Sequence, residues 1–521
     1  MSRKPKEHFQ RTKKLAQALK KEDVYNWLVT KGYFPEAYVL PPCFEVTKNP
    51  GFGTIYFQVT TSNKGRTEFQ PNISEFQQVH FPKTNLTDRT FGIIHPEIHS
   101  DIAFRIANDW DAVVSCIFHD DNLVCSYSFP IPVDNNNLGE IGSLRSGRMI
   151  YEWIEMAEND VASIAFQYKY LITTDIKNFY PSVYTHSIPW ALHGKDYIRN
   201  QRCPNNHPNR SNYNLLGNCL DKLFQNANDG CTNGIPIGPA VSDIVSEIVL
   251  SGVDRKLSEA LVNARIDNDV TVVRFKDDYR ILAKNESSGR STIKFLQSAL
   301  KEYRLELHDG KTEFYSLPNG LFRNWRSEYY NINPETKKNY DFEGFKEVYL
   351  SIIRIDGNNP GCGVIDRFLA DLVNRKDYSI CVKLDGKSLS KIISLLLMLA
   401  DLRIKAFPKI LAIIESVLRS DFGSSHKVPI VEYLEEFLQE LNSRETDNSY
   451  LIFWIIYFIR SNGLEGNLRN SYTFTDPIVK AVHEDLLACF NNCNDFTIFS
   501  AVNTVAQRVS LLEHLDVFNP Q

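Results

Sequence analysis

The chain has 521 residues, 43% of them hydrophobic and 12% aromatic, so it is too long for one ordinary core and supports two to four domains. A net charge of −5 excludes a protein that simply coats nucleic acid, but it allows a local basic groove, because phosphate binding depends on the local field. The ten cysteines form no CxxC pair, which favours reduced thiols in a cytoplasmic protein over a disulfide scaffold.

A zinc-binding module and a membrane protein are both disfavoured by the sequence. The spacings of Cys203, His207, Cys219 and Cys231 are too irregular for a zinc site, so we interpret these residues as loop and core residues. No apolar signal-peptide core is present near the N-terminus, and the most apolar run, Leu451 to Ile459, is too short to span a bilayer. We therefore expect no membrane partner.

The N-terminal part of the chain mixes helical and extended patterns. Apolar residues at helical spacing predict one helix from about Glu7 to Lys31, ended by Gly32. Short runs predict strands at Thr54 to Val59 and at Ala112 to Phe118, and the polar stretch Asp134 to Asn137 predicts a turn. A mixed α and β region therefore extends to about residue 159.

The pattern changes at Tyr170 and again at Gly361. From Tyr170 to about Leu317 the order is strand, helix, long helix, hairpin, helix and strand. After Gly361, six segments with helical spacing predict stacked helix pairs, an α-repeat or solenoid-like array without a fixed sequence period. These segments are Leu389 to Asp401, Phe407 to Leu418, Ile430 to Leu441, Leu451 to Arg460, Ile478 to Phe490 and Ala501 to Leu515.

Three carboxylates occupy the ends of predicted strands. Asp175 ends the apolar run that begins at Tyr170, and the pair Asp277 and Asp278 forms the turn of a predicted hairpin from Val270 to Ala283. Alone, each has an ordinary interpretation, as a strand end or as an Asp-rich turn. Together they supply hard oxygen ligands for the two Mg²⁺ ions, about 3.5–4 Å apart, that activate a 3′-hydroxyl and stabilise the leaving pyrophosphate. We expect Mg²⁺ as the cofactor, with Mn²⁺ as an alternative.

Two further elements lie on either side of the predicted hairpin. A Gly/Pro-rich turn containing Gly238 and Pro239 precedes an apolar helix and lets the backbone approach a base pair closely. Its plain alternative is an ordinary helix N-terminus capped by Ser242. Lys311 follows a later turn, where it could protonate pyrophosphate or be a simple surface lysine.

These four elements, in this order, resemble motifs A to D of reverse transcriptases. Two motifs are similar in sequence to those of bacterial abortive-infection and defence-associated reverse transcriptases. They are Asp-Ile-Lys-Asn-Phe-Tyr-Pro-Ser, which begins at Asp175, and Gly-Ile-Pro-Ile-Gly-Pro-Ala-Val-Ser, which begins at Gly234. The segments 32–36 and 40–42 are similar to the start of that group, and the resemblance covers about residues 32–350. It implies an α+β right-hand polymerase with fingers and palm. The helical segments after Gly361 fit the family in outline only, and their periodicity predicts an all-α, HEAT-like helical-repeat C-terminal domain.

The resemblance also predicts the domain organisation. We expect an N-terminal helical segment, fingers, a palm with motifs A to D, a connection or thumb-like segment and an α-helical repeat domain. Their expected ranges are residues 1–36, 37–160, 161–320, 321–360 and 361–521.

The resemblance assigns roles to individual residues. Asp175 and Asp277 would be the main metal ligands with support from Asp278, and the adjacent Ile176 is assigned to both the metal and the nucleotide sites. Lys311 would approach the triphosphate.

The other assigned residues concern the incoming nucleotide. Tyr180 would be the steric gate that prefers dNTPs over NTPs, with Phe179 buried beneath it, and Gly238 and Pro239 would lie near the nascent base pair. Our candidates for the triphosphate clamp of the fingers are Arg145 and Arg148.

Two departures from the family pattern bear on function. Ile237 replaces the glutamine that many reverse transcriptases carry before the motif-B glycine, which puts ordinary templated copying in doubt, and Lys276 stands where a small apolar residue is common. Lys276 would hold the primer terminus or face solvent. The stretch Phe342 to Phe345 is a candidate primer-grip turn.

The family likeness implies a bacterial cytoplasmic DNA polymerase that acts in antiphage defence. Its expected partners are dNTPs, the DNA product, a noncoding RNA in some members, and further copies of the chain in a homo-oligomer. Synthesis would be protein-primed, usually from a tyrosine, or RNA-assisted. Two alternatives stay open: a conventional RNA-templated reverse transcriptase, and a non-catalytic nucleic-acid-binding palm. Retention of Asp175, Asp277 and Asp278 counts against the second, because clustered carboxylates are costly without a metal.

Overall fold

The computed structural model describes most of the chain. The described residues are 4–63, 67–83, 87–134, 137–142, 147–200, 212–334, 339–374, 377–444, 448–490 and 493–515, and the side chains of residues 147–154 and 421 are not described. Within these ranges no helix is long and apolar enough to cross a membrane.

The N-terminal region forms two helices where one was expected. Helix α1 spans Lys4–Gln17 and α2 spans Lys21–Val29, with Lys20 in extended backbone between them. The Trp110 indole donates a hydrogen bond of 2.8 Å to the Ala16 carbonyl, which in a continuous helix would accept from the amide of Lys20. This tertiary contact therefore divides into two helices a stretch whose apolar spacing alone predicts one.

Both strands predicted in the fingers region are wrong. Residues 112–117 lie in helix α4, Trp110–Ile117, and Phe118 is its C-cap, since the apolar residues of this run are buried at helical spacing. The stretch 54–59 stays irregular because the Asp101 carboxylate accepts hydrogen bonds from the amides of Tyr56 and Phe57, at 2.8 and 3.2 Å, in place of a neighbouring strand.

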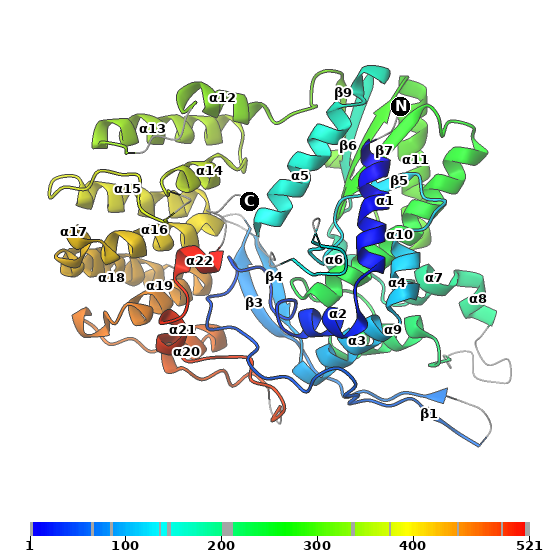
Figure 1. Cartoon of the computed structure of the whole chain (residues 1–521), viewed down its shortest axis with the longest axis horizontal. Helices are drawn as coiled ribbons and strands as arrows, with labels where there is room; N and C mark the ends of the chain where they lie inside the picture. The colour runs from blue at the N-terminus through cyan, green and yellow to red at the C-terminus, as the bar shows by residue number, and fades with distance from the viewer. Residues whose placement is uncertain are drawn as a thin grey trace.

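The remaining elements of this region are short. They are β1 Thr60–Thr61, β2 Thr67–Glu68, β3 Gln77–Pro82, β4 Asp88–Ile93, α3 Pro96–Asn108, β5 Val124–Ser126, α5 Gly147–Ala162 and the 3₁₀ turn η1 Ala165–Gln167. Strands β3 and β4 form an antiparallel hairpin that lies between the central sheet and the C-terminal helices (Figure 1).

A five-stranded sheet with the order β5-β7-β8-β6-β9 forms the centre of the larger lobe. Its other strands are β6 Tyr170–Asp175, β7 Val270–Phe275, β8 Asp278–Ala283 and β9 Glu313–Ser316. All pairings are antiparallel except that of β5 with β7. The register sets Asp175 opposite Asp278 and Phe275 opposite Asp278, so the predicted hairpin and the end of β6 meet at one edge.

Helices cover this sheet and connect its strands. They are α6 Phe179–Ser182, α7 Ser187–His193, α8 Lys195–Asn200, α9 Leu216–Asn226, α10 Ala240–Asn263, α11 Glu286–Glu302 and the 3₁₀ turn η2 Asp309–Lys311. The long helix α10 is apolar on nearly all sides and is buried, which is typical of a helix at the centre of a large core. Ser242 does not cap it, because α10 begins after Pro239 without a side-chain cap, and the Ser242 hydroxyl is buried.

The C-terminal part of the described chain is entirely helical apart from turns. Its elements are α12 Asn324–Ile332, α13 Phe342–Asn358, α14 Val364–Asp371, α15 Leu389–Leu402, η3 Ile404–Ala406, α16 Phe407–Arg419, α17 Asp421–Ser424, α18 Lys427–Ser443, α19 Ser449–Ser461, η4 Glu465–Asn467, α20 Pro477–Glu484, α21 Val502–Ala506 and α22 Leu511–Leu515. Successive helices stack into a second lobe (Figure 1). Four of the six predicted segments match single helices. The segment from Ile478 contains only the shorter helix α20, and the last segment is divided between α21 and α22.

The primer-grip interpretation of residues 342–345 is wrong. These residues form the first turn of α13, and Asp341 caps it by accepting a hydrogen bond of 2.8 Å from the Gly344 amide. Phe345 is fully buried in the helical lobe.

The two lobes have separate hydrophobic cores, but one N-terminal segment belongs to the C-terminal core. Residues between Tyr33 and Phe44, together with β3 and β4, pack with the C-terminal helices. His514 Nε2 donates to the carbonyls of Ala37 and Leu40, at 3.0 and 3.2 Å, and the Tyr450 hydroxyl donates to the Tyr38 carbonyl at 2.7 Å. The second core is thus closed by residues from both ends of the described chain.

Candidate active site

The site is built where β6 ends beside the β7–β8 turn. Asp175 is the last residue of β6, and its neighbour Ile176 donates a hydrogen bond of 3.2 Å to the Asp277 carbonyl. Lys276 holds the turn in left-handed backbone, with φ of 51°. The strand end and the turn are therefore joined directly at the point where the carboxylates converge.

Burial and mutual repulsion disfavour ionisation of these carboxylates. Burial, followed by the Asp175 charge, raises the pKa of Asp277 to about 6. The pKa of Asp278 is also raised, by desolvation and then by Asp277 and Asp175. Lys311 Nζ pairs with Asp175 Oδ2, whereas the buried Asp175 Oδ1 has no hydrogen-bond partner. An anionic cluster of this kind is stabilised by cations.

The carboxylates are suited to divalent ions, although the described residues contain no group of three or more His, Cys, Asp or Glu side chains arranged to hold a metal. Two observations support the fit. Asp175 Oδ1 is an unsatisfied buried acceptor, and the Asp277 charge faces Asp175. Hard oxygen donors of this type select Mg²⁺ or Mn²⁺.

These carboxylates line a cavity of about 460 Å³ that also receives residues from the N-terminal segment and the β3–β4 hairpin. Asp278 does not line it. The lining residues are Glu36, Tyr38, Lys83, Asp88, Arg89, Thr90, Phe91, Asp175, Ile176, Asn178, Phe179, Tyr180, Pro181, Ile237, Gly238, Asp243, Lys276, Asp277, His308 and Lys311. Three parts of the chain that are distant in sequence thus enclose one polar cavity.

The aromatic pair after β6 lies in the same cavity. Asn178 has left-handed backbone and starts the short helix α6, in which Phe179 is 3% exposed and packs edge to face on Tyr180 with ring centroids 5.3 Å apart. The Tyr180 hydroxyl donates a hydrogen bond to Asp243, and Lys276 Nζ lies 3.7 Å from the same carboxylate. Burial and then Asp243 raise the pKa of Tyr180 well above its usual value.

The glycine of the predicted Gly/Pro-rich turn is required by both conformation and space. Gly238 has φ of 118°, and a Cβ at this position would lie 2.7 Å from Pro35 Cγ and 3.1 Å from Phe91 Cδ1. The preceding carbonyl, of Ile237, accepts a hydrogen bond of 2.9 Å from the Gly92 amide in β4. Gly238 and Ile237 line the cavity, and Pro239, the N-cap of α10, does not.

The predicted clamp arginines cannot be placed. Arg145 lies outside the described residues, and Arg148 lies in α5 without a described side chain. Two other cations that the sequence reasoning missed, Lys83 and Arg89, come from the β3–β4 hairpin and line the cavity. A signal for them exists in the sequence, since both flank a polar turn between two apolar strands.

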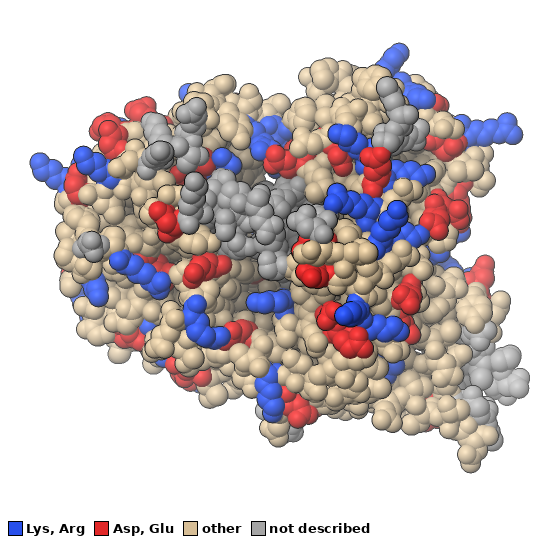
Figure 2. Space-filling model, viewed as in Figure 1, with Lys and Arg blue, Asp and Glu red and all other residues tan. Residues whose placement is uncertain are grey.

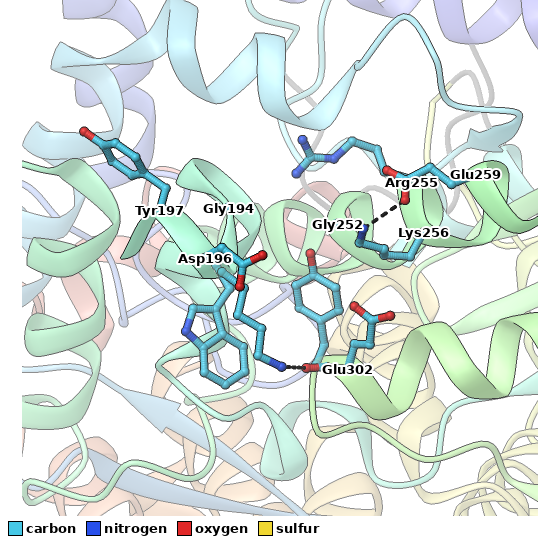
Figure 3. Close-up of a pocket in the computed structure, with 11 residues that line it drawn as sticks. Gly194, Asp196, Tyr197, Gly252, Arg255, Lys256, Glu259 and Glu302 are labelled. Atoms are coloured by element: carbon cyan, nitrogen blue, oxygen red, sulfur yellow. Dashed lines mark hydrogen bonds and ion pairs between the residues drawn. The ribbon is translucent and has the colours of Figure 1, made fainter. Parts of the chain in front are cut away.

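A second cavity, of about 370 Å³, lies near the other end of α10 (Figure 3). Its residue Arg255 is roughly 18 Å along the helix from Asp243. Its cations are all engaged: Lys256 pairs with Glu259 at 2.8 Å, Lys195 contacts the Glu302 carbonyl at 3.2 Å, and Arg255 donates to the Ala191 carbonyl. Acidic and basic side chains are also interspersed over the face in Figure 2. The carboxylate cavity is therefore the candidate active site.

The sheet and its site define a class of protein. Two strand-borne carboxylates, a helix that starts at a glycine turn and a cavity closed by a basic hairpin form the palm and fingers of a right-hand polymerase. Residues 133–346 match the family described as reverse transcriptase (RNA-dependent DNA polymerase). The chain thus contains a reverse-transcriptase domain and is an RNA-directed DNA polymerase by class, and the family uses divalent metals. The expected fold class is confirmed.

The chain is also similar to solved telomerase structures, though weakly. Apo telomerase from Candida tropicalis matches with 11% identity and a TM-score of 0.34, over 77% of this chain and 70% of that one. Telomerase from Candida albicans in complex with a fragment of telomeric RNA matches with 12% identity and a TM-score of 0.29, over 80% and 69%. Likeness at this level carries no functional argument. A comparison with curated proteins gives no match.

Proposed function

We propose that the chain is a reverse-transcriptase-type DNA polymerase that adds dNTPs by two-metal phosphoryl transfer and acts in bacterial antiphage defence by abortive infection. The observation that carries the polymerase proposal is the cavity in which Asp175 and Asp277 meet Lys83, Arg89 and Lys311. It combines ligands for divalent cations with positive charge for a triphosphate. The defence role rests on the sequence resemblance of the motifs around Asp175 and Gly238.

In this proposal Asp175 and Asp277 hold the metals, with Asp278 and the backbone at Ile176 in support. The bound ions would activate the attacking hydroxyl and neutralise the charge of the leaving pyrophosphate. Lys311, paired with Asp175 in the metal-free protein, would turn to the triphosphate once cations neutralise the carboxylates. Lys83 and Arg89 would orient the phosphates from the fingers side.

Tyr180 would exclude ribonucleotides. Its ring lines the cavity, and its hydroxyl is directed towards Asp243 on α10. A 2′-hydroxyl on the incoming sugar would meet this ring. We expect Tyr180→Ala to admit NTPs, and an unchanged preference for dNTPs in that variant would remove Tyr180 from the gate role.

Two other cavity residues support a proposal for templating and priming. Ile237 offers no side-chain hydrogen bond to a nascent base pair, which favours atypically templated, RNA-assisted or untemplated synthesis. Tyr38 lines the same cavity, and we propose its hydroxyl as the protein primer. By the same resemblance we propose a cytoplasmic homo-oligomer, with the helical segment from residue 361 as its contact surface or as a cradle for a noncoding RNA.

Nucleotide incorporation by the purified protein tests the proposal. The protein is incubated with Mg²⁺ and each labelled dNTP, with and without RNase and proteinase K. Labelled DNA that shifts on proteinase K treatment and ignores RNase supports protein-primed synthesis, whereas loss of activity with RNase points to a bound RNA. The double variant Asp277→Asn, Asp278→Asn should be inactive yet folded, and activity equal to wild type would remove these residues from the site.

Tyr38→Phe gives the sharper test of priming. This variant should lose the DNA–protein linkage but still extend an added oligonucleotide, because the metal-binding carboxylates are untouched. A linkage that persists in Tyr38→Phe would assign priming to another hydroxyl.

A further inference from the structure

A buried arginine in β7 lies directly beneath the catalytic turn. The side chain of Arg274 is 1% exposed, and its guanidinium donates four hydrogen bonds and makes one further ion-pair contact. Nε and Nη2 contact Asp254 Oδ2 at 3.0 and 2.9 Å, while Nη1 and Nη2 contact the two oxygens of Glu247 at 2.8 and 3.0 Å. Nη1 also donates to the carbonyl of Lys276 at 3.0 Å.

The two carboxylates that hold Arg274 lie on α10. Glu247 and Asp254 are 1% and 2% exposed, and their separation of seven residues sets them on one face of the helix, two turns apart. Glu247 also accepts hydrogen bonds from the hydroxyls of Ser126 and Ser128, at 2.9 and 2.7 Å. The Tyr279 hydroxyl donates to Asp254 at 2.8 Å. Every member of this cluster is therefore hydrogen-bonded.

The cluster forms hydrogen bonds with both polar backbone groups of Lys276, the residue that precedes Asp277. The Lys276 amide donates to Ser128 Oγ at 2.8 Å, and the Lys276 carbonyl accepts from Arg274. Left-handed backbone is unfavourable for a non-glycine residue, so it persists only where surrounding contacts enforce it. These two hydrogen bonds enforce it at the position that aims the Asp277 carboxylate.

Stability alone gives a poor account of the cluster. A buried ion pair is often no more stable than apolar residues of the same volume, because both charges lose their hydration. The chain nevertheless keeps one cation and two anions in the most buried part of α10 and β7. What this arrangement provides is orientation. Arg274 and Ser128 form hydrogen bonds with the backbone of Lys276. Glu247 and Ser126 in turn contact the Ser128 hydroxyl.

We propose that Arg274, Glu247 and Ser128 are positioning residues that fix the β7–β8 turn, so that Asp277 faces Asp175 ready for metal. This inference deepens the proposed function and rests on it, since it takes Asp277 as a metal ligand. Without these hydrogen bonds to the backbone of Lys276, the carboxylates of Asp175 and Asp277 separate through their mutual repulsion, and the divalent ion loses part of its ligand set.

The chain offers a matched pair of variants. Ser126→Ala and Ser128→Ala each delete one hydroxyl that donates to Glu247, but only the Ser128 hydroxyl accepts from the Lys276 amide. We expect Ser128→Ala to weaken Mn²⁺ binding to the full chain by about tenfold, measured by electron paramagnetic resonance. It should also lower kcat for dNTP incorporation without raising the dNTP KM. Ser126→Ala removes contacts with Ser128 but leaves both hydrogen bonds of Lys276 in place, so it should change all three values much less.

Equal Mn²⁺ affinity in the two variants, or a loss seen only in thermal stability, would overturn the positioning role. Ser128→Cys, which keeps the volume and supplies only a weak acceptor, provides the same comparison if Ser128→Ala does not fold. Wild-type protein that binds Mn²⁺ but incorporates no dNTP would overturn the proposed function, while the affinities of the two variants would still decide the positioning role. Wild-type protein that binds no Mn²⁺ would overturn both.

Discussion

The Tyr180 hydroxyl donates a hydrogen bond to the Asp243 carboxylate, which links the ring after β6 to the first turn of α10. Two segments of the palm thereby fix the orientation of one aromatic ring at the cavity wall. A hydrogen bond to a charged group contributes about 1.5–3 kcal/mol, enough to hold a ring in a single position.

We predict that Asp243→Ala relaxes sugar discrimination. With its hydroxyl released, the Tyr180 ring moves, and the preference for dNTPs over NTPs should fall by roughly tenfold. Competition between dNTP and NTP incorporation measures this. Tyr180→Phe is the matched control, because it keeps the ring and loses the same bond. If Asp243 acts through Tyr180, the double variant should have the same dNTP preference as either single variant. Additive losses of dNTP preference would show that Asp243 does not act through Tyr180.

Removing a carboxylate should stabilise the protein while abolishing its chemistry. Asp277→Asn eliminates the repulsion with the buried carboxylate of Asp175, which Lys311 alone neutralises only in part. We expect the unfolding free energy of the metal-free variant to rise by roughly 1 kcal/mol and dNTP incorporation to disappear. Thermal unfolding with and without Mg²⁺ provides the measurement: Mg²⁺ should raise the Tm of wild type and leave the variant nearly unchanged. A variant less stable than wild type contradicts the argument.

Mild acid should loosen the contact between the N-terminal segment and α22. Desolvation lowers the pKa of His514 from 6.5 to about 4, so the folded state binds fewer protons than the unfolded state between these values. The stability contributed by neutral His514 is complete above pH 6.5 and is lost as the pH falls towards 4. We expect a loss of about 1 kcal/mol between pH 7.5 and 5.5 in urea unfolding. His514→Gln should reduce this pH dependence. If the unfolding free energy of the variant changes with pH as it does in wild type, other groups cause the pH dependence.

Gly238→Ala should damage the site through both strain and crowding. The residue has φ of 118°, and the added methyl would meet Pro35 at 2.7 Å. Gly230→Ala is the control for strain alone, since Gly230 has φ of 75° and nothing lies within 4 Å of its Cβ position. We expect the control to lose about 1–2 kcal/mol of stability, and Gly238→Ala to lose a further 1–3 kcal/mol together with dNTP incorporation. Equal losses in the two variants would mean that the close approach to Pro35 is unimportant.

The sequence predicted the elements that carry strong local signals. The strand before Asp175, the hairpin around Asp277 and most of the C-terminal helices follow from apolar periodicity, and the structure contains them. Helix α4 was missed because a short apolar run does not distinguish strand from helix. The irregular stretch 54–59 depends on Asp101, which no local pattern links to it.

The site was predicted less completely than the fold. Tyr180 and Lys311 were found by their distance from the carboxylates in a family pattern, and both line the cavity. The polar turn between two apolar runs marks the hairpin that carries Lys83 and Arg89. Their place at the cavity, like that of Tyr38, depends on tertiary packing of the N-terminal region, which sequence spacing does not reveal. The sequence does contain a signal for Glu247 and Arg274. Each is a single charge inside an otherwise apolar segment, where an unpaired charge would be costly, so a buried partner is expected.

The anchoring of residues 37–40 by His514 has a consequence for how the protein is made. The two partners of the Leu40 contact are 474 residues apart, so this contact forms only after nearly all of the described chain has been synthesised. Glu36 and Tyr38 belong to the cavity wall, so this part of the wall depends on a contact made by α22. A chain truncated before His514 would therefore lack the contact that anchors residues 37–40, and with it a completed cavity wall at Glu36 and Tyr38.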